Sequence, residues 1–521
     1  MVHARRWPLR NAFVLIATLA LAAALPTAAL GSGGPTVKNY QVNQAYPGPF
    51  PTNQQQEPSL AANPKNALNL IAGANDEIGQ PACTDTNPSN CGFVPKSVAG
   101  YYASFDGGKT WPCQGLIDLG SLGIAEIASG DPSQTFDSQG NAFFGTLALP
   151  FPVTSREVRN GFPADFVVAK STDGGCTYTS ATVISGNSPA AFDDKDAIAA
   201  DANPSSPYHD NVYAAWTIFN KNAATTGTGK DQIVFSRSTD GGKTWSKPNA
   251  ISPANANAAN VGREGAAVKV GPDGSVYVSW LDVVDKTAAI RITVSHDGGK
   301  TFPSAPVTVA TVSDDLISPL PGTSFRDYSR PFPALGAASD GAVYVAWGNH
   351  QSGHGVALLA VSHDGAQTWS APMIAGDVPG RTPFFVALTN EPSGAVDVAF
   401  SAVDNVPFGT VPGAGVVYYD TYLSRSTDGG TTFAPPLKIS TASSDPDVSS
   451  SNSLDAQFIG DYISAAADAT HVYVAWTDSR NGSTCDAVDA YRTGQSGAPN
   501  VIAQCPKTFG NTDIFLGTIT P

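Results

Sequence analysis

The sequence predicts an all-β fold, a seven-bladed β-propeller whose blades are four-stranded antiparallel sheets. Two observations support this prediction: one turn motif recurs six times at a nearly constant interval, and a pair of short strands recurs seven times, in six cases upstream of such a turn. The composition agrees, because 51 glycines and 40 prolines suit many short strands joined by tight turns. Apolar residues make up 42% of the chain, which is enough for a packed core.

The repeated turn has the pattern Ser-x-Asp-Gly, with a threonine four residues after the aspartate and an aromatic residue next to that threonine. Glycine accepts a positive φ, and the aspartate accepts backbone N–H groups, so the motif suits a tight turn between two strands. In the fifth copy, Ala366 replaces a glycine and predicts a slightly different turn. The six aspartates, spaced by 67, 67, 57, 67 and 64 residues, are Asp106, Asp173, Asp240, Asp297, Asp364 and Asp428.

Two further strands precede each turn, and the first of them begins with polar residues, as in Glu57-Pro-Ser-Leu and Asp131-Pro-Ser-Gln. The second alternates small and large apolar residues and ends on tryptophan in residues 212–216, 276–280, 343–347 and 472–476. A seventh unit begins near Asp455 and lacks the turn motif because the chain ends.

Seven units with only six turn motifs leave one outer strand missing. Residues 37–42 resemble the strands that follow the turns, so we expect them to supply the outer strand of the last blade. This arrangement closes the ring between the two ends of the chain and protects the sheet edges. A six-bladed ring with one irregular flank is the alternative.

The N-terminal residues 1–31 are predicted to be a signal peptide, and residues 32–521 a single propeller domain. Three arginines precede an apolar run over residues 12–25, and small residues at 28–31 offer a cleavage site. No later stretch reaches about 18 apolar residues, the length of a spanning helix. We therefore expect a secreted, monomeric protein without a membrane span.

The six cysteines contain no Cys-x-x-Cys pair, which argues against a zinc site and predicts three disulfides in an oxidising compartment. Proximity in the sequence favours Cys83–Cys91 and Cys485–Cys505, each of which closes an irregular insertion. Cys113 would then pair with Cys176, at and just after adjacent turns.

The charge pattern limits the partners and cofactors. A net charge of −15 argues against nucleic acid, because phosphate binding needs clustered lysine and arginine. No cofactor is expected. The run Asp193-Asp-Lys-Asp196 offers hard oxygen ligands for a structural calcium ion, with a plain polar turn as the other interpretation.

The six turns resemble the Asp-box (BNR) repeats of bacterial sialidases, and the resemblance spans residues 37–521. It implies a site where the inner strands enter the axial channel. There, arginines would grip a substrate carboxylate, a tyrosine helped by a glutamate would act as nucleophile, and an aspartate would act as acid and base. By this resemblance the catalytic residues are Tyr462, Glu264 and Asp131. The substrate-binding residues are Arg263, Arg330, Arg381 and Tyr328.

The resemblance implies a secreted sialidase-like propeller that acts on glycans, with exo-α-sialidase activity. One departure matters: the family usually carries an Arg-Ile-Pro motif on the first inner strand, whereas this chain has Glu57-Pro-Ser-Leu. A non-catalytic propeller that binds a polysaccharide or a protein is therefore the alternative.

Overall fold

The computed structural model describes residues 34–46, 48–83, 96–150, 164–186, 191–220, 231–253, 262–284, 287–312, 320–325, 331–351, 354–407, 409–413 and 415–521. The predicted signal peptide lies outside the described residues. From Pro35 to Pro521 the chain is one compact unit.

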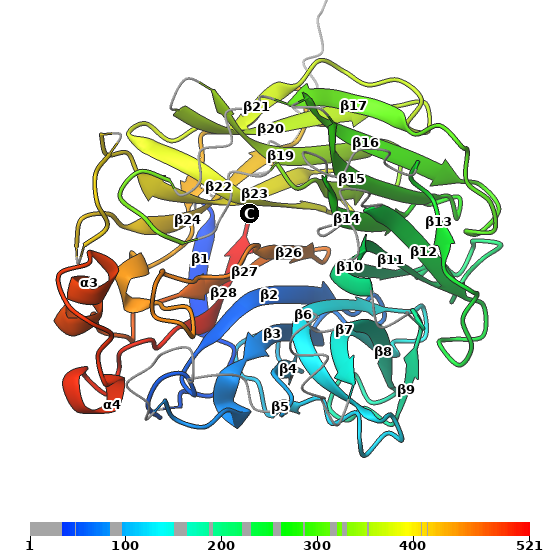
Figure 1. Ribbon diagram of the computed structural model, residues 1–521. Coiled ribbons are helices and arrows are strands. Elements are labelled where there is room, and N and C mark those ends of the chain that lie inside the picture. The colour runs from blue at the N-terminus through cyan, green and yellow to red at the C-terminus, as the bar shows by residue number, and fades with distance from the viewer. Residues whose placement is uncertain are drawn as a thin grey trace, which may run out of the picture. The chain divides into compact units, whose positions relative to one another are not determined.

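Seven four-stranded antiparallel sheets surround a central axis in this unit (Figure 1), so the seven-bladed prediction is confirmed and the six-bladed alternative is wrong. Blade 1 is β2 (Gln55–Ala62), β3 (Leu70–Asp76), β4 (Ala99–Ser104) and β5 (Cys113–Leu116); blade 2 is β6 (Glu126–Phe136), β7 (Ala142–Pro150), β8 (Asp165–Ser171) and β9 (Ser180–Val183). Blade 3 is β10 (Ala191–Ala200), β11 (Val212–Asn220), β12 (Gln232–Ser238) and β13 (Asn249–Ala250); blade 4 is β14 (Gly262–Val270), β15 (Val276–Val284), β16 (Thr287–Ser295) and β17 (Val307–Val312). Blade 5 is β18 (Ala334–Ala337), β19 (Val343–Gln351), β20 (His354–Ser362) and β21 (Met373–Gly376); blade 6 is β22 (Arg381–Asn390), β23 (Val396–Asp404), β24 (Tyr419–Ser426) and β25 (Leu437–Lys438). Blade 7 is β26 (Ser464–Ala467), β27 (Val472–Asp478), β28 (Asp513–Thr520) and β1 (Thr36–Gln41).

The N-terminal strand β1 closes the ring as predicted, pairing antiparallel with β28 from Thr36↔Thr520 to Gln41↔Phe515. Asp513, at the start of β28, strengthens this closure. Its carboxylate accepts hydrogen bonds from four side-chain amides at 2.7–3.2 Å, those of Gln41, Asn43, Asn481 and Asn511. Two of the four donors belong to the N-terminal segment, so one buried carboxylate joins both ends of the chain.

The blades pack through large buried side chains contributed by their second strands. The four tryptophans of the repeated strand are fully buried, each within a cluster of apolar residues. In the cluster around Trp347, side chains of β15 and β16 pack against β18 and β19, so the core lies between neighbouring blades. Burial of these aromatic faces is what holds adjacent sheets together.

The six motif turns share one hydrogen-bond network, at the end of each blade opposite the start of its innermost strand. In the first turn, the Asp106 carboxylate accepts bonds from the Ser104 hydroxyl at 2.9 Å and the Thr110 hydroxyl at 2.7 Å. In the fifth turn, Ala366 adopts φ 67°, and its N–H bonds Ser362 Oγ at 2.9 Å, as glycine does elsewhere. The expected difference in that turn is therefore wrong, because the network imposes the left-handed conformation on alanine.

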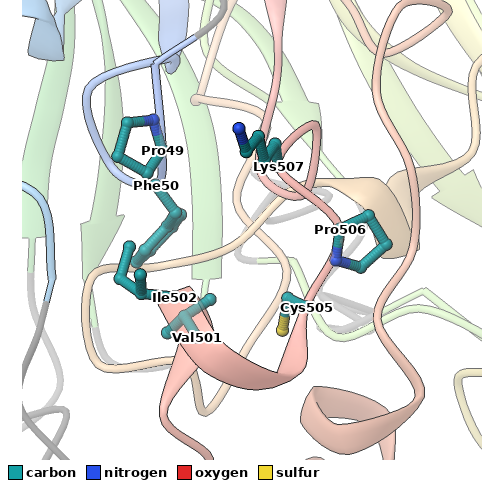
Figure 2. A pocket seen from close by; sticks show the side chains of 7 residues that line it. All are labelled: Pro49, Phe50, Val501, Ile502, Cys505, Pro506 and Lys507. Carbon is teal, nitrogen blue, oxygen red and sulfur yellow. The ribbon is translucent and has the colours of Figure 1, made fainter.

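The connection between β27 and β28 carries the described α-helices, α3 (Asp486–Arg492) and α4 (Val501–Gln504). The predicted Cys485–Cys505 disulfide joins the residues that flank them. Beside it lies a pocket of about 240 Å³ lined by Pro49, Phe50, Val501, Ile502, Cys505, Pro506 and Lys507 (Figure 2). No described helix is long and apolar enough to cross a membrane.

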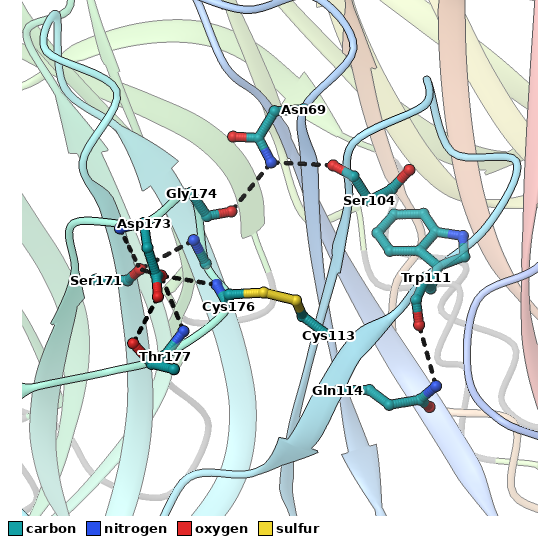
Figure 3. Close-up of a disulfide and its surroundings, with 11 residues drawn as sticks. Asn69, Ser104, Trp111, Cys113, Gln114, Ser171, Asp173, Gly174, Cys176 and Thr177 are labelled. Carbon is teal, nitrogen blue, oxygen red and sulfur yellow. Dashed lines mark hydrogen bonds between the residues drawn. A yellow bond between two sulfur atoms is a disulfide. The ribbon is translucent and has the colours of Figure 1, made fainter.

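The predicted Cys113–Cys176 disulfide is also present and joins β5 of blade 1 to the motif turn of blade 2 (Figure 3). Asn69 supports the same junction, because its amide donates to the carbonyl oxygens of Ser104 and Gly174, each at 3.0 Å. Blades 1 and 2 are thus fastened at the outer rim. Cys91 lies outside the described residues, and so does its predicted bond to Cys83.

Candidate functional site

A cavity of about 280 Å³ lies on the axis and is lined by residues from the innermost strand of every blade. The pairing of first and second strands defines equivalent positions around it. Ser59↔Gly73 in blade 1 matches Ala197↔Ala215 in blade 3, for example. In each blade, the residue two places before this position belongs to a set of seven equivalent residues, which we call the mouth ring. Its members are Glu57, Asp131, Lys195, Gly265, Phe332, Phe385 and Tyr462.

The backbone is bulged at most of these positions. Glu57, Asp131, Lys195 and Phe385 have φ of 59°, 49°, 51° and 48°, and the register shifts beside each of them. A bulge redirects side chains, and a left-handed conformation costs a non-glycine residue about 1–2 kcal/mol. Strain that recurs at equivalent positions favours a functional role for the mouth ring.

The mouth ring has a polar half and an apolar half. Tyr462, Glu57, Asp131 and Lys195 stand on four consecutive blades, from blade 7 to blade 3. Across the axis, Phe332 covers Gly265, where a Cβ would lie 2.3 Å from the phenylalanine ring. One half of the mouth ring therefore offers hydrogen-bonding groups and the other half offers an apolar surface.

Lys195 spans the mouth of the cavity. Its ammonium lies 2.6 Å from Asp461 Oδ2, which links blade 3 to the segment that leads into blade 7. Burial lowers the pKa of Lys195, but the nearby carboxyl groups outweigh burial and raise the pKa well above its usual value. These groups are Asp461, Asp131, Glu57 and Asp194. The side chain is therefore a cation. The same ammonium lies 5.6 Å from the centre of the Tyr462 ring.

The segment that carries Tyr462 lies against Glu57. Gly460, two residues earlier, has φ 84°, and a Cβ there would lie 2.5 Å from Glu57 Cγ, so only glycine brings this segment so close. Burial raises the pKa of Tyr462 well above its usual value, and Glu57 and Asp131 raise it further. At neutral pH the phenol therefore keeps its proton, in the electrostatic field of these carboxyl groups.

Asn75 holds Glu57 and Asp131 in place. Its amide nitrogen donates to Glu57 Oε2 at 2.7 Å, and its amide oxygen accepts the Asp131 N–H at 2.9 Å. A Cβ at Gly130 would lie 2.6 Å from this oxygen, so the glycine lets Asn75 approach the neighbouring blade. One β3 side chain thus joins the carboxyl group of Glu57 to the backbone of Asp131.

The predicted catalytic residues lie in the same region. Tyr462 and Asp131 belong to the mouth ring, and the charge of Glu264 raises the pKa of Asp194, beside Lys195. Sequence reasoning did not single out Lys195 or Asp461 as site residues, and it gave Glu57 no role. The sequence feature that could have identified these three residues is their position in the polar segments at the start of the innermost strands.

The predicted substrate-binding arginines bind carboxylates of their own blades. Arg263 Nε lies 3.0 Å from Asp282, its cross-strand neighbour on β15. Arg381 lies 2.8 Å from Asp404, its cross-strand neighbour on β23, and 2.9 Å from Asp420. Neither arginine lines the axial cavity. Arg330 and Tyr328 lie outside the described residues, so the substrate-binding set stays a prediction.

Within the described part of the chain, no group of three or more His, Cys, Asp or Glu residues has the arrangement of a metal site. The run from Asp193 to Asp196 forms part of β10. Lys195 of this run donates a hydrogen bond to Asp461, so the run itself already contains a cation. A structural calcium ion at this run stays a prediction.

Comparison with known proteins gives one curated relative and several solved structures. No family model matches the chain. A sialidase from Micromonospora viridifaciens is 26% identical over 333 residues, covering 60% of this chain and 45% of that protein, so the chain spans less than half of its relative.

Among solved structures, the Hadza microbial sialidase Hz136 has a TM-score of 0.43 at 15% identity, covering 74% of this chain and 72% of that one. The leech intramolecular trans-sialidase has a TM-score of 0.44 at 14% identity, covering 69% and 67%. The α-L-arabinofuranosidase Arb93A from Fusarium graminearum has a TM-score of 0.44 at 13% identity, covering 77% and 97%. Likeness at this level carries no argument about activity.

Proposed function

We propose that this chain is a glycoside hydrolase whose reacting side chains are Tyr462, Glu57 and Asp131 of the mouth ring. One observation carries the proposal. Equivalent positions on four consecutive blades place a phenol, two carboxyl groups and an ammonium in one half of the mouth ring. Tyr462 and Lys195 line the axial cavity, and Glu57 and Asp131 directly precede its lining residues Pro58 and Pro132. The curated relative is a sialidase, which supports a glycan as the substrate.

The chemistry follows from these groups. Tyr462 attacks the anomeric carbon while Glu57 takes the phenolic proton, and Asp131 protonates the oxygen of the breaking glycosidic bond. Water then attacks the same carbon, Asp131 takes its proton, and the released tyrosine recovers its own proton from Glu57. The transition state resembles an oxocarbenium ion, and surrounding carboxylates stabilise its positive charge. A raised pKa at Tyr462 makes the adjacent base necessary.

Two features of this proposal differ from the sequence-based hypothesis. Glu57 replaces Glu264 as the base, because Gly460 brings the Tyr462 segment directly against Glu57. The exo-α-sialidase activity is kept as a proposal about the substrate. Its arginine clamp is not built on Arg263 and Arg381, since both guanidinium groups are held by aspartates within their blades.

Export after removal of residues 1–31 is part of the proposal. The disulfides at Cys113–Cys176 and Cys485–Cys505 are consistent with an oxidising, extracellular compartment. Sequencing the N-terminus of protein recovered from the culture medium tests this point. A mature chain that begins near Ser32 supports it, and protein retained in the cell with Met1 intact contradicts it.

The decisive experiment offers the secreted protein a panel of fluorogenic glycosides, with an α-sialoside first and neutral α- and β-glycosides beside it. We expect turnover of at least one member, and a loss of at least about 100-fold in kcat for Tyr462→Phe and Glu57→Gln. Tyr473→Phe is the matched control, because Tyr473 is a buried tyrosine of the same blade that bonds Asp468 at the far end of the strand.

The alternative is a non-catalytic propeller that binds a polysaccharide or a protein at the same face. Glycan binding that Lys195→Met abolishes, without turnover of any glycoside, would establish that alternative and end the hydrolase proposal. Turnover that survives Tyr462→Phe and Glu57→Gln unchanged would also end it.

A further inference from the structure

Two carboxyl groups from neighbouring blades meet at one backbone amide of the mouth ring. The N–H of Lys195 donates to Asp194 Oδ1 at 2.9 Å and lies 3.4 Å from Asp131 Oδ2. Asp131 belongs to β6 and Asp194 to β10, so the blade packing brings them together. Because both carboxyl groups converge on one N–H, they are within reach of a hydrogen bond to each other, which would raise the pKa of Asp194. A hydrogen bond between two carboxyl groups requires a proton on one of them.

The surroundings keep that proton in place. Burial raises the pKa of Asp194 well above its usual value. The Lys195 ammonium lowers it, while Asp131 and Glu264 raise it again. Asp196 and Tyr462 are the other titratable groups that interact with the pair, while Glu57 and Asp461 act on its neighbours Lys195 and Tyr462. Ionising both members would place two adjacent, partly buried negative charges among further carboxylates, which favours one proton on the pair at neutral pH.

We propose that Asp194 is a positioning residue that stores one proton on the Asp131–Asp194 pair, so that the pair acts as the acid of the proposed reaction. Its catalytic meaning rests on the proposed function, but the stored proton does not. In the first half of the reaction the shared proton moves fully onto Asp131 and from there to the leaving oxygen, which leaves the pair without a proton. In the second half of the reaction the proton taken from water restores the shared state, so protons balance over one cycle.

Asp194→Asn separates this role from mere packing. Asparagine keeps the size of the side chain and donates a fixed hydrogen bond to Asp131, which favours the ionised form of that carboxyl group. The acid is then lost at lower pH. We expect the alkaline limb of the pH–rate profile to move down by at least about one unit, a loss of about tenfold near neutral pH.

The same strand supplies a matched control. Glu126 on β6 shares a hydrogen bond with Asp165, and burial together with that carboxylate raises the pKa of Glu126 to about 7. Neither residue lines the axial cavity. Glu126→Gln therefore removes a second carboxyl pair of the same blade, and we expect it to leave the pH–rate profile unchanged.

The experiment measures carboxyl protonation in the secreted protein directly, by NMR of side-chain carboxyl carbons labelled in aspartate, and then the pH–rate profile. We expect a protonated aspartate signal near pH 7 that persists in Glu126→Gln and disappears in Asp194→Asn. Should Asp194→Asn not fold, Asp131→Asn is measured for loss of the same shared proton.

The outcomes separate this inference from the hydrolase proposal. A signal lost with no glycoside turned over by any form of the protein upholds the shared proton and ends only the proposed reaction. An unchanged set of protonated aspartates in Asp194→Asn overturns the shared proton. Loss of the signal with an unmoved alkaline limb overturns the role in the acid step.

Discussion

Replacing Lys195 by methionine removes the cationic member of the mouth ring. The substitution tests the charge arrangement of the ring by stability, without reference to activity. The Lys195–Asp461 contact is 2.6 Å long, and its two side chains are only 9% and 4% exposed. Removing one member of a buried ion pair typically costs about 3–5 kcal/mol, because the remaining charge is left uncompensated. We therefore expect Lys195→Met to lower the free energy of unfolding by about that amount at pH 7.

The pH dependence gives the test a sign. Burial lowers the pKa of Lys195, yet the four nearby carboxyl groups raise it above the unfolded value. Its stabilisation is therefore present throughout the acidic and neutral range, and is lost only as the pH rises through the folded-state pKa, above about 10.4. In Lys195→Met the carboxylates can relieve their repulsion by taking up protons, so the deficit should shrink as the pH falls from 7 to about 5.

Unfolding in guanidinium chloride at pH 7 and pH 5 measures both effects, and a double-mutant cycle with Asp461→Asn isolates the pair. Lys170→Met is the control, because Lys170 lies 5.2 Å from the centre of the Phe143 ring and donates to a carbonyl oxygen at 2.8 Å, and it forms no ion pair with a carboxylate in the described part of the chain. The reasoning is refuted if Lys195→Met costs no more than Lys170→Met. A coupling energy near zero between Lys195 and Asp461 refutes it as well.

Three further predictions concern the fold. Replacing Cys113 and Cys176 together by serine should lower the free energy of unfolding by about 4 kcal/mol, since the bond closes a 63-residue separation, and denaturant titration measures it. Hydrogen bonds outweigh burial at Asp240 and lower its pKa to about 2. The stability it contributes is present above about pH 3.8 and is lost as the pH falls towards 2, so Asp240→Asn should flatten thermal melting temperatures across that range. Asp513→Ala should cost about 3 kcal/mol and speed hydrogen exchange in β1, because four amide donors lose their acceptor.

The fold could be predicted because its determinants are local and repeated. Each motif turn satisfies its own hydrogen bonds within a few residues, as the Ser104, Asp106 and Thr110 network does, so its sequence signature is complete in one segment. Counting units against turns then placed the N-terminal strand in blade 7, which the β1–β28 pairing confirms. Only the effect of Ala366 was misjudged, since backbone strain can be imposed by neighbours that the motif already contains.

The site could be predicted only in part, because its determinants are not local. Tyr462 and Asp131 were singled out from their place at the start of inner strands, and both belong to the mouth ring. Arg263 was predicted as a site residue for the same reason, yet it lies two residues before Gly265, the mouth-ring residue of its blade. A bulge changes which residue of a polar segment faces the axis. When the left-handed residue of a bulge is not glycine, the sequence contains no residue type that predicts the bulge.

The left-handed non-glycine residues of the mouth ring also indicate where a functional site lies. Gly265 shows that the fold accepts glycine at a mouth-ring position, where a left-handed conformation carries no penalty. Glu57, Asp131 and Lys195 adopt the same conformation at a cost of about 1–2 kcal/mol each, so the turn geometry does not explain their presence. Their side chains must supply the reason. All three belong, with Tyr462, to the polar half of the mouth ring, and there any chemistry of this propeller should be sought.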